Sequence, residues 1–206
     1  MIGNSSNNGL EIILASASSS RANLLHNACI PFKTRASNID EEPIKDSLKK
    51  TGAAAIEAAE ALAELKAITV SKTMPHALVI GADQILDLEG EWFDKPVDIK
   101  QAREHLLCLR GRTHHLATAV VIAFGGIRVW HAHDCPALTM RSFSDAFIDQ
   151  YIATAGDAIL SSVGAYHLEG LGAQLFDKID GSFFSILGLP MLPVMDFLRG
   201  RGTMLS

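Results

Sequence analysis

Short apolar runs alternate along this chain with segments of helical periodicity, and they begin after a polar stretch over residues 1–9. Alternation of this kind predicts strands interleaved with helices. Strands are predicted at 11–14, 30–36, 78–80, 113–124 and 127–141. Helices are predicted at 18–27, at 52–72, between 98 and 111, at 144–153, and from 190 to just before 200.

Capping signals mark some of the predicted helix ends. Asp98, with Gln101 three residues later, forms a variant of the capping box. Gly111 can end that helix in a left-handed conformation. Pro190 suits the first turn of the last helix, because it has no N–H group to leave unpaired there.

Gly125 and Gly126 separate the apolar runs 113–124 and 127–141, and two glycines suit the primed turn of a long hairpin. Long antiparallel strands combined with strand-to-helix crossovers predict an α/β fold, with a mixed sheet flanked by helices. We expect one domain over residues 10–206, after the polar tail. The pattern leaves the order of the strands open.

Composition narrows the class of protein. A chain of 206 residues that is 48% hydrophobic can bury one substantial core. Its longest apolar stretches, such as 116–124, are far shorter than the roughly 20 residues that a membrane-spanning helix needs. The first residues carry neither a basic segment nor an apolar run that would signal export, so we expect a cytoplasmic protein.

The cysteines and the net charge each add one expectation. Cys29, Cys108 and Cys135 are odd in number and lack the close spacing of a zinc site, so we expect reduced thiols that fill the core. A formal net charge of −5 argues against nucleic-acid binding, which normally needs a basic surface. A single polyanionic ligand could still be held locally.

The first candidate site lies in the segment IILASASSSRANLL, where an apolar strand runs into small hydroxyl residues and then a helix. The N–H groups of a helix start, the hydroxyls of Ser16 and Ser18 and the guanidinium of Arg21 could together bind an anion such as phosphate. In the alternative, these serines only cap the helix and fill a tight turn.

The second candidate site lies in LVIGADQILDLEG, where Asp83 follows a buried strand and a glycine. A carboxylate placed there could hold Mg²⁺, or it could orient and deprotonate a water molecule. The alternative is an ordinary turn aspartate. Asp87 and Glu89 precede Gly90 and are interpreted as hairpin-turn residues.

Two lysines are further candidates. Lys66 falls on the inward face of the helix predicted at 52–72, so it needs an anionic partner or an outlet to solvent. Lys95 precedes Pro96, which favours an extended backbone that could direct the ammonium group toward a cleft. An exposed loop lysine is the alternative for Lys95.

Acidic residues after the second strand could complete a metal site. Asp40 or Glu41, in the string NIDEEP, could join Asp83, since Mg²⁺ usually takes one or two protein carboxylates together with phosphates and waters. The same pair could instead form a solvated turn. The histidine pairs at 114–115 and 131–133 have strand spacing and do not complete a coordination shell.

Taken in order, several strings resemble the Maf family of nucleoside triphosphate pyrophosphatases. The strings are LASASSSR, NIDEE, AELKA, VIGADQ, DKPVDIKQAREHLLCLRGRTHH, VGAYHLEGLGA and GLP. They cover about 12–198. The resemblance implies two lobes around a deep cleft, dependence on a divalent cation (Mg²⁺ or Mn²⁺), and hydrolysis of a nucleoside triphosphate to monophosphate and pyrophosphate. It also implies frequent dimerisation, which allows a homodimer.

The resemblance assigns roles to individual positions. Asp83 matches the catalytic acid residue of the family's GAD motif, and Asp83 with Glu41 is expected to hold metal. The expected phosphate-binding residues are Ser16, Ser18, Arg21, Lys66 and Lys95. The family usually writes the first loop SxSPRR, whereas Ser19 and Ser20 stand here in place of the proline and the first basic residue.

Base preference is expected to depend on Ser20, Gln84 and Glu169. Members that resemble the dTTP and UTP enzymes carry Arg, Thr and Gln there, and those of the 7-methyl-GTP type carry Trp, Gln and Glu. Two of the latter three are present, and a carboxylate could accept both N–H donors of guanine, so a modified guanine nucleotide is predicted. The alternatives are a dTTP/UTP enzyme, an enzyme for deaminated purine nucleotides, and a non-catalytic nucleotide-binding regulator of septum formation.

Overall fold

A computed structural model describes residues 10–204 of the chain, so the polar tail predicted at 1–9 lies outside the described residues. The strands are β1 (Glu11–Leu14), β2 (Lys33–Thr34), β3 (Ala77–Leu88), β4 (Glu91–Phe93), β5 (Thr113–Phe124), β6 (Ile127–Asp134), β7 (Ala137–Met140) and β8 (Phe176–Asp180). The helices are α1 (Ser19–Asn27), α2 (Glu42–Lys50), α3 (Ala55–Thr73), α4 (Ile99–Leu109), α5 (Asp145–Ala155), α6 (Phe183–Ile186) and α7 (Met191–Gly200). Short 3₁₀ turns occupy Gly156–Ser161, Val163–Ala165 and Leu171–Leu175.

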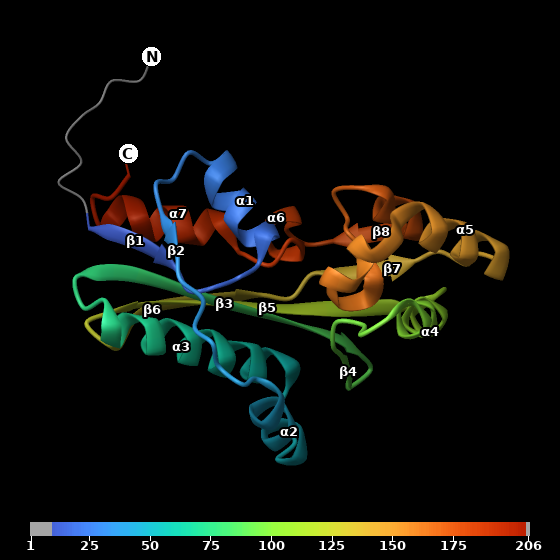
Figure 1. Ribbon diagram of the computed structural model, residues 1–206, viewed down its shortest axis with the longest axis horizontal. Helices are drawn as coiled ribbons and strands as arrows, with labels where there is room; N and C mark the ends of the chain where they lie inside the picture. Colours follow the sequence, from blue (N-terminus) through green and yellow to red (C-terminus); the bar gives the residue numbers. More distant parts are fainter. Residues whose placement is uncertain (1–9, 205–206) are drawn as a thin grey trace.

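Within the described residues, all eight strands belong to one mixed sheet, which confirms the predicted fold class (Figure 1). Its main order is β2-β1-β3-β5-β7-β8, with β4 beside β3 and β6 beside β5. β1 runs parallel to β2 and β3, whereas β3, β5, β6, β7 and β8 pair antiparallel. The two long strands β3 and β5 form the axis of the molecule.

One edge of β3 is left open in the middle of the strand. β1 pairs with β3 as far as Ile80, and β4 pairs with the same strand only from Leu86 onward. β5 covers the opposite edge continuously. The residues between Ile80 and Leu86 therefore border a gap in the sheet, and this gap contains Asp83 and Gln84.

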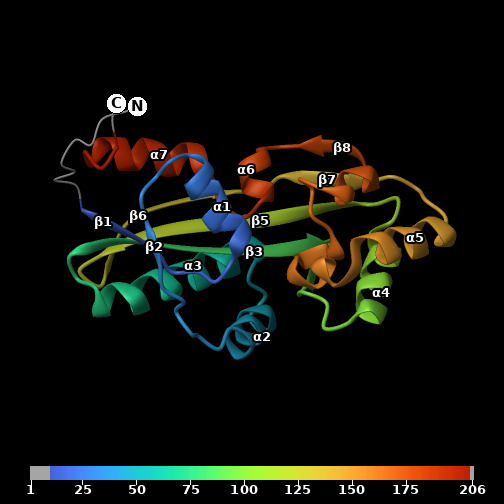
Figure 2. The same ribbon diagram turned by 45° about the horizontal axis from the view of Figure 1, so that its top comes forward.

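Alternation along β3 sends successive side chains to opposite faces of the sheet. Leu78, Ile80 and Ala82 pack in a core cluster with α1 and α7, whereas Ile85 packs with the alanines of α3. Figures 1 and 2 agree that α1, α6 and α7 lie over one face and α3 over the other. The sheet is thus buried on both faces at this end.

The other end of the long strands is covered by a second cluster of elements. α4, α5 and the 3₁₀ turns pack around Leu86, Leu106, Leu116 and Leu138, which form part of a separate buried cluster (Figure 2). α1 and α3 belong to the first end. The chain thus carries two groups of elements along one sheet.

Several predicted boundaries need correction. The strand predicted at 78–80 runs from Ala77 to Leu88, so Asp83 lies within a strand rather than just after one. The strand predicted at 30–36 shrinks to Lys33–Thr34. The second hairpin strand, predicted at 127–141, breaks between Asp134 and Ala137, because Pro136 has no N–H group to donate to a ladder.

The cysteines also depart from one expectation. Cys29, Cys108 and Cys135 are free thiols, as predicted, but all three are exposed rather than filling the core. The turn at Asp87 is confirmed, since its Oδ1 accepts a hydrogen bond of 2.8 Å from Gly90 N. Among residues 10–204, no helix is long and apolar enough to cross a membrane.

Candidate functional site

A cleft of about 760 Å³ opens beside the free edge of β3. Its walls come from the β1–α1 loop, the start of α2, α3, the loop after β4, and the segment 161–169. Asp40, offered as the alternative to Glu41, does not line this cleft, whereas the other predicted site residues do: Ser16, Ser18, Ser20, Arg21, Glu41, Lys66, Asp83, Gln84, Lys95 and Glu169. The fold thus brings together residues that lie up to about 150 positions apart in the chain, while their individual roles stay predictions.

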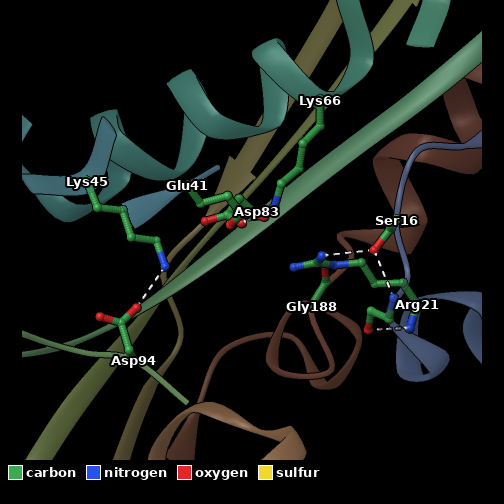
Figure 3. A network of polar contacts seen from close by, with 9 residues as sticks. Ser16, Arg21, Glu41, Lys45, Lys66, Asp83, Asp94 and Gly188 are labelled. Atoms are coloured by element: carbon green, nitrogen blue, oxygen red, sulfur yellow. Dashed lines mark hydrogen bonds and ion pairs between the residues drawn. The ribbon is translucent and has the colours of Figure 1, made fainter. Parts of the chain in front are cut away.

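The β1–α1 loop carries the first polar cluster. Ser18 is the N-cap of α1, and its Oγ accepts a hydrogen bond of 3.4 Å from Arg21 N. Ser16 Oγ accepts from Ser18 N at 3.1 Å and from Arg21 Nη1 at 3.3 Å (Figure 3). Ser18 therefore does cap the helix, as the alternative interpretation held, while Ser16 closes the turn before it, and the same loop also lines the cleft.

Arg21 is held from two sides. Its Nε donates a 2.8 Å hydrogen bond to the carbonyl of Gly188, in the loop after α6. Burial lowers the pKa of the guanidinium, and the charges of Asp83 and Glu41 partly offset this effect. Arginine starts from so high a pKa that it stays protonated at neutral pH. A fixed cation therefore faces the cleft from the α1 side.

Two carboxylates of the cleft, those of Asp83 and Glu41, form an acidic centre around Lys66. Lys66 Nζ lies 2.6 Å from Asp83 Oδ1 and 2.8 Å from Glu41 Oε1. Only 7% of Lys66 is exposed, so its ammonium is satisfied by these carboxylates rather than by solvent. The anionic partner that the inward-facing helical position demanded is confirmed, and it comes from two different elements, β3 and the start of α2 (Figure 3).

The acidic centre fits a divalent cation. Asp83 Oδ2 is buried and has no hydrogen-bond partner among the described residues. The Glu41 carboxylate is nearby, because it contacts Lys66, as Asp83 does. Six carboxylates and four cationic side chains line the cleft, so a polyphosphate needs additional positive charge to bind there. Residues 10–204 contain no group of three or more His, Cys, Asp and Glu residues placed to hold a metal, so substrate oxygens or water would have to supply the remaining ligands.

Lys95 lies in the loop after β4 and lines the cleft. Partial burial lowers the pKa of its ammonium group, and the charges of Arg21 and Lys66 lower it further, while Glu41 and Asp83 act in the opposite direction. Cations that repel one another are stabilised by an anion placed between them. Lys95 and Arg21 thus favour a polyanion in the space between them.

Gln84 and Glu169, two residues predicted to recognise the base, differ in how many of their polar atoms are already bonded to the protein. Gln84 Nε2 lies 2.7 Å from Thr118 Oγ1, 2.9 Å from the carbonyl of Ser185 and 3.2 Å from that of Ile186. Because carbonyls only accept hydrogen bonds, its amide nitrogen is committed to the protein, and its carbonyl oxygen is the group left for a ligand. Glu169 is exposed at the cleft wall, 3.8 Å from His167 Nδ1.

A buried pair supports the wall that carries Glu169. His114 Nε2 shares a 2.8 Å hydrogen bond with the hydroxyl of Tyr166, which lines the cleft. Tyr151 donates a further hydrogen bond of 3.1 Å to the carbonyl of Ala165, where the backbone turns with a positive φ of 59°. These contacts tie the segment before Glu169 to β5 and α5, so a wall of the cleft is rigidly held.

His114 should make the protein sensitive to mild acid. Its burial lowers the pKa to about 3 from the ordinary histidine value of 6.5, so between these two values the unfolded chain binds a proton that the folded chain does not. Stability should therefore fall as the pH falls below about 6.5, with His114 contributing a loss of roughly 2 kcal/mol by pH 5.

Urea unfolding at pH 7 and pH 5 measures this contribution. His114→Gln should show a smaller drop between the two pH values than the wild type, whatever its stability at pH 7. His133→Gln, at an exposed position of β6, should keep the wild-type drop. Equal drops in all three proteins would contradict the assignment.

The cleft also contains polar residues that sequence reasoning missed. Lys45 on α2 lies 2.8 Å from Asp94 Oδ1 in the loop after β4 (Figure 3). The two positions are 49 residues apart, so no local spacing indicates their contact. No helix was predicted at Glu42–Lys50, and predicting one would have placed Lys45 one helical turn away from Glu41.

Comparison with known proteins supports one family. Residues 11–201 match the family Maf, described as Maf-like protein. The chain is 52% identical over 195 residues to a nucleoside triphosphate pyrophosphatase of Rhodospirillum rubrum, covering 95% of this chain and 96% of that protein. It is 51% identical over 190 residues to one of Granulibacter bethesdensis and 47% identical over 190 residues to a 7-methyl-GTP pyrophosphatase of Brucella abortus, each time covering 92% of this chain and 96% of the relative. The chain belongs to the Maf family.

Proposed function

We infer that this chain is a hydrolase that splits a nucleoside triphosphate into a monophosphate and pyrophosphate. The observation that carries the inference is the convergence of Asp83, Glu41, Lys66, Lys95 and Arg21 on one cleft. A buried acidic centre beside fixed cations suits a phosphoric anhydride, whose reaction moves charge onto the leaving oxygens. Relatives that share about half of the sequence over nearly their whole length carry pyrophosphatase names.

The cations and the helix start hold the polyphosphate. The hydroxyls of Ser16 and Ser18 lie beside the first N–H groups of α1, which begins at Ser19, and this is an anion-binding arrangement. Arg21 is fixed by Gly188 and can donate its remaining N–H groups to phosphate oxygens. Lys95 lines the same cleft. Together these groups would place the α-phosphate beside Asp83.

Asp83 acts on the attacking water. Its Oδ1 is held by Lys66, which fixes the carboxylate, and Oδ2 remains free either to accept the proton of the water or to hold a cation. Mg²⁺ or Mn²⁺ held by Asp83 and Glu41 would supply charge neutralisation and a more acidic water when bound. Attack at the α-phosphorus breaks the bond to the bridging oxygen, and pyrophosphate leaves.

A modified guanine nucleotide such as 7-methyl-GTP is the proposed substrate. Glu169 stands exposed at the wall of the cleft, where a carboxylate can accept two hydrogen bonds from the guanine edge. A methylated purine also carries a positive charge that a carboxylate attracts. Ser20 leaves the opposite side of the site without an aromatic ring, so stacking would contribute less than a tryptophan there.

A substrate panel tests the proposal. Canonical, 7-methylated and deaminated nucleoside triphosphates are incubated with the purified protein, with Mg²⁺ and Mn²⁺ compared and with the metal removed by chelation. Pyrophosphate and orthophosphate are assayed separately. We expect pyrophosphate as the product, the highest kcat/KM for the 7-methylated guanine nucleotide, and loss of turnover on chelation.

Other outcomes select other functions. Orthophosphate as the first product would indicate a simple phosphatase, and a preference for dTTP and UTP or for deaminated purines would replace the base assignment. Nucleotide binding without turnover would favour a regulator. A cytoplasmic location, a homodimer and the lack of nucleic-acid binding stay predictions.

A further inference from the structure

A lysine on α2 bridges the cleft. Lys45 Nζ donates to Asp94 Oδ1 at 2.8 Å, and the pair joins the start of α2 to the loop that also carries Lys95. The Lys45 side chain is 22% exposed, whereas that of Asp94 is 74% exposed. An ion pair with one so exposed partner contributes little stability, so its rupture costs little free energy.

The charges around Lys45 keep it protonated. Burial alone would lower the pKa of its ammonium group, but the hydrogen bond to Asp94 and the charges of Asp83, Asp94 and Glu41 outweigh burial and raise it. The lysine therefore lies within the electrostatic reach of the acidic centre. In Figure 3 the Asp83–Glu41 pair lies between Lys45 and Arg21.

Of the cations Lys45, Lys66 and Arg21, Lys45 has the protein contact that is broken most easily. Lys66 is bound by two carboxylates and is almost fully buried, and Arg21 is fixed by Ser16 and Gly188. A lysine ammonium on a flexible stem can exchange one oxygen partner for another. A phosphate oxygen offers a charge-assisted hydrogen bond at least as strong as that of an exposed carboxylate.

We propose that Lys45 is a further substrate-binding residue. Its ammonium group breaks the contact with Asp94 and binds a phosphate oxygen of the triphosphate instead. The inference rests on the proposed function and adds a cation that the sequence motifs did not indicate. Asp94 then competes with the substrate for Lys45. It holds the ammonium in place in the free enzyme and weakens triphosphate binding by the same contact.

This exchange predicts effects of opposite sign at the two ends of the pair. Lys45→Met keeps the length of the side chain but removes the charge, so KM should rise about tenfold, the value of one charge-assisted hydrogen bond, while kcat changes little. Asp94→Asn frees Lys45, so KM should fall by about twofold to threefold, because an exposed pair is worth under 1 kcal/mol. If the Lys45–Asp94 pair served only to hold α2 against the loop after β4, both variants would bind the triphosphate more weakly.

Three controls sharpen the measurement. Lys50→Met removes the same charge from an exposed position of α2 outside the cleft lining, and KM should be unchanged. Lys45→Arg keeps the charge and should keep KM close to that of the wild type. In the Lys45→Met background, Asp94→Asn should no longer lower KM, whereas a general electrostatic effect of Asp94 would persist there.

Inorganic tripolyphosphate provides a readout without a base. Its inhibition constant, or its Kd by calorimetry if the enzyme does not turn over, should rise about tenfold in Lys45→Met. KM or Kd changes of the same sign in both single variants, or an unchanged constant in Lys45→Met, would overturn the inference. If the wild type binds tripolyphosphate through Lys45 but releases no pyrophosphate from any nucleotide, the proposed function fails and the assignment of Lys45 stands.

Discussion

Asp83→Asn should lower kcat by a factor of about 10²–10⁴, the usual contribution of a general acid–base group in the reacting position. The asparagine still presents an oxygen to Lys66 Nζ, which lies 2.6 Å from Asp83 Oδ1, so the side chain should stay in place. What it loses is the negative charge and the basicity of Oδ2, the oxygen that has no protein partner. Pyrophosphate release under saturating substrate measures the loss.

The matched control is Asp87→Asn, four residues further along β3. Asp87 Oδ1 accepts a hydrogen bond from Gly90 N at the turn and does not line the cleft, so kcat should stay within about twofold. Melting curves of both variants should resemble that of the wild type. Near wild-type turnover by folded Asp83→Asn would remove Asp83 from the mechanism and, with it, the main support for the proposed function.

Local sequence signals predicted those features that depend on nearest neighbours. Glu11–Leu14 and Thr113–Phe124 have the predicted bounds because most residues of each strand form one apolar run that ends at polar or turn residues. Asp98 caps α4 as predicted, with its Oδ1 accepting from Gln101 N at 2.7 Å. The reciprocal bond, from Val97 N to Gln101 Oε1 at 2.8 Å, completes a box displaced by one residue.

The errors arose where tertiary structure overrides the local pattern. β3 looks short in the sequence because Asp83 and Gln84 interrupt its apolar run, yet pairing with β5 carries the strand through them. α2 was not predicted, because its two apolar positions, Ile44 and Leu48, have helical spacing but form only a narrow stripe on a short, charged segment with no fully buried residue. The pairing of Lys45 with Asp94 depends on where α2 docks, and no spacing encodes it.

The sequence indicated the location of the candidate residues better than the strand boundaries, and this has a physical reason; their roles stay predictions. Polar residues that a strand or an inward helix face tolerates at high cost, such as Asp83 and Lys66, stand out against an apolar pattern. Resemblance to the family then added positions with weak local signals, such as Glu169. The sequence could not reveal that the amide of Gln84 is committed to Ser185 and Ile186.

Gly81→Ala should destabilise the protein by about 3 kcal/mol, at the upper end of what overpacking usually costs. A Cβ at Gly81 would lie 2.6 Å from Ala67 N and would come closer still to the carbonyl oxygen of Ala63. Both are backbone atoms of α3, so no side-chain rotation relieves the clash, and the helix must move away from β3. For a chain of this size the melting temperature should fall by roughly 6–12 °C.

The same displacement should impair the site, because α3 carries Lys66 and β3 carries Asp83. Gly81 lies two residues before Asp83 and therefore faces α3 on the same side of the sheet. Because Gly81 has no side chain, α3 can approach β3 closely enough for the Lys66 ammonium group to contact the Asp83 carboxylate. Folded Gly81→Ala should thus also lose turnover, measurable below its melting temperature. Gly200→Ala, whose added Cβ meets no heavy atom within 4 Å apart from its own helix and its chain neighbours, should lower neither stability nor turnover. A wild-type melting temperature in Gly81→Ala would mean that close packing of α3 on β3 does not position the acidic centre.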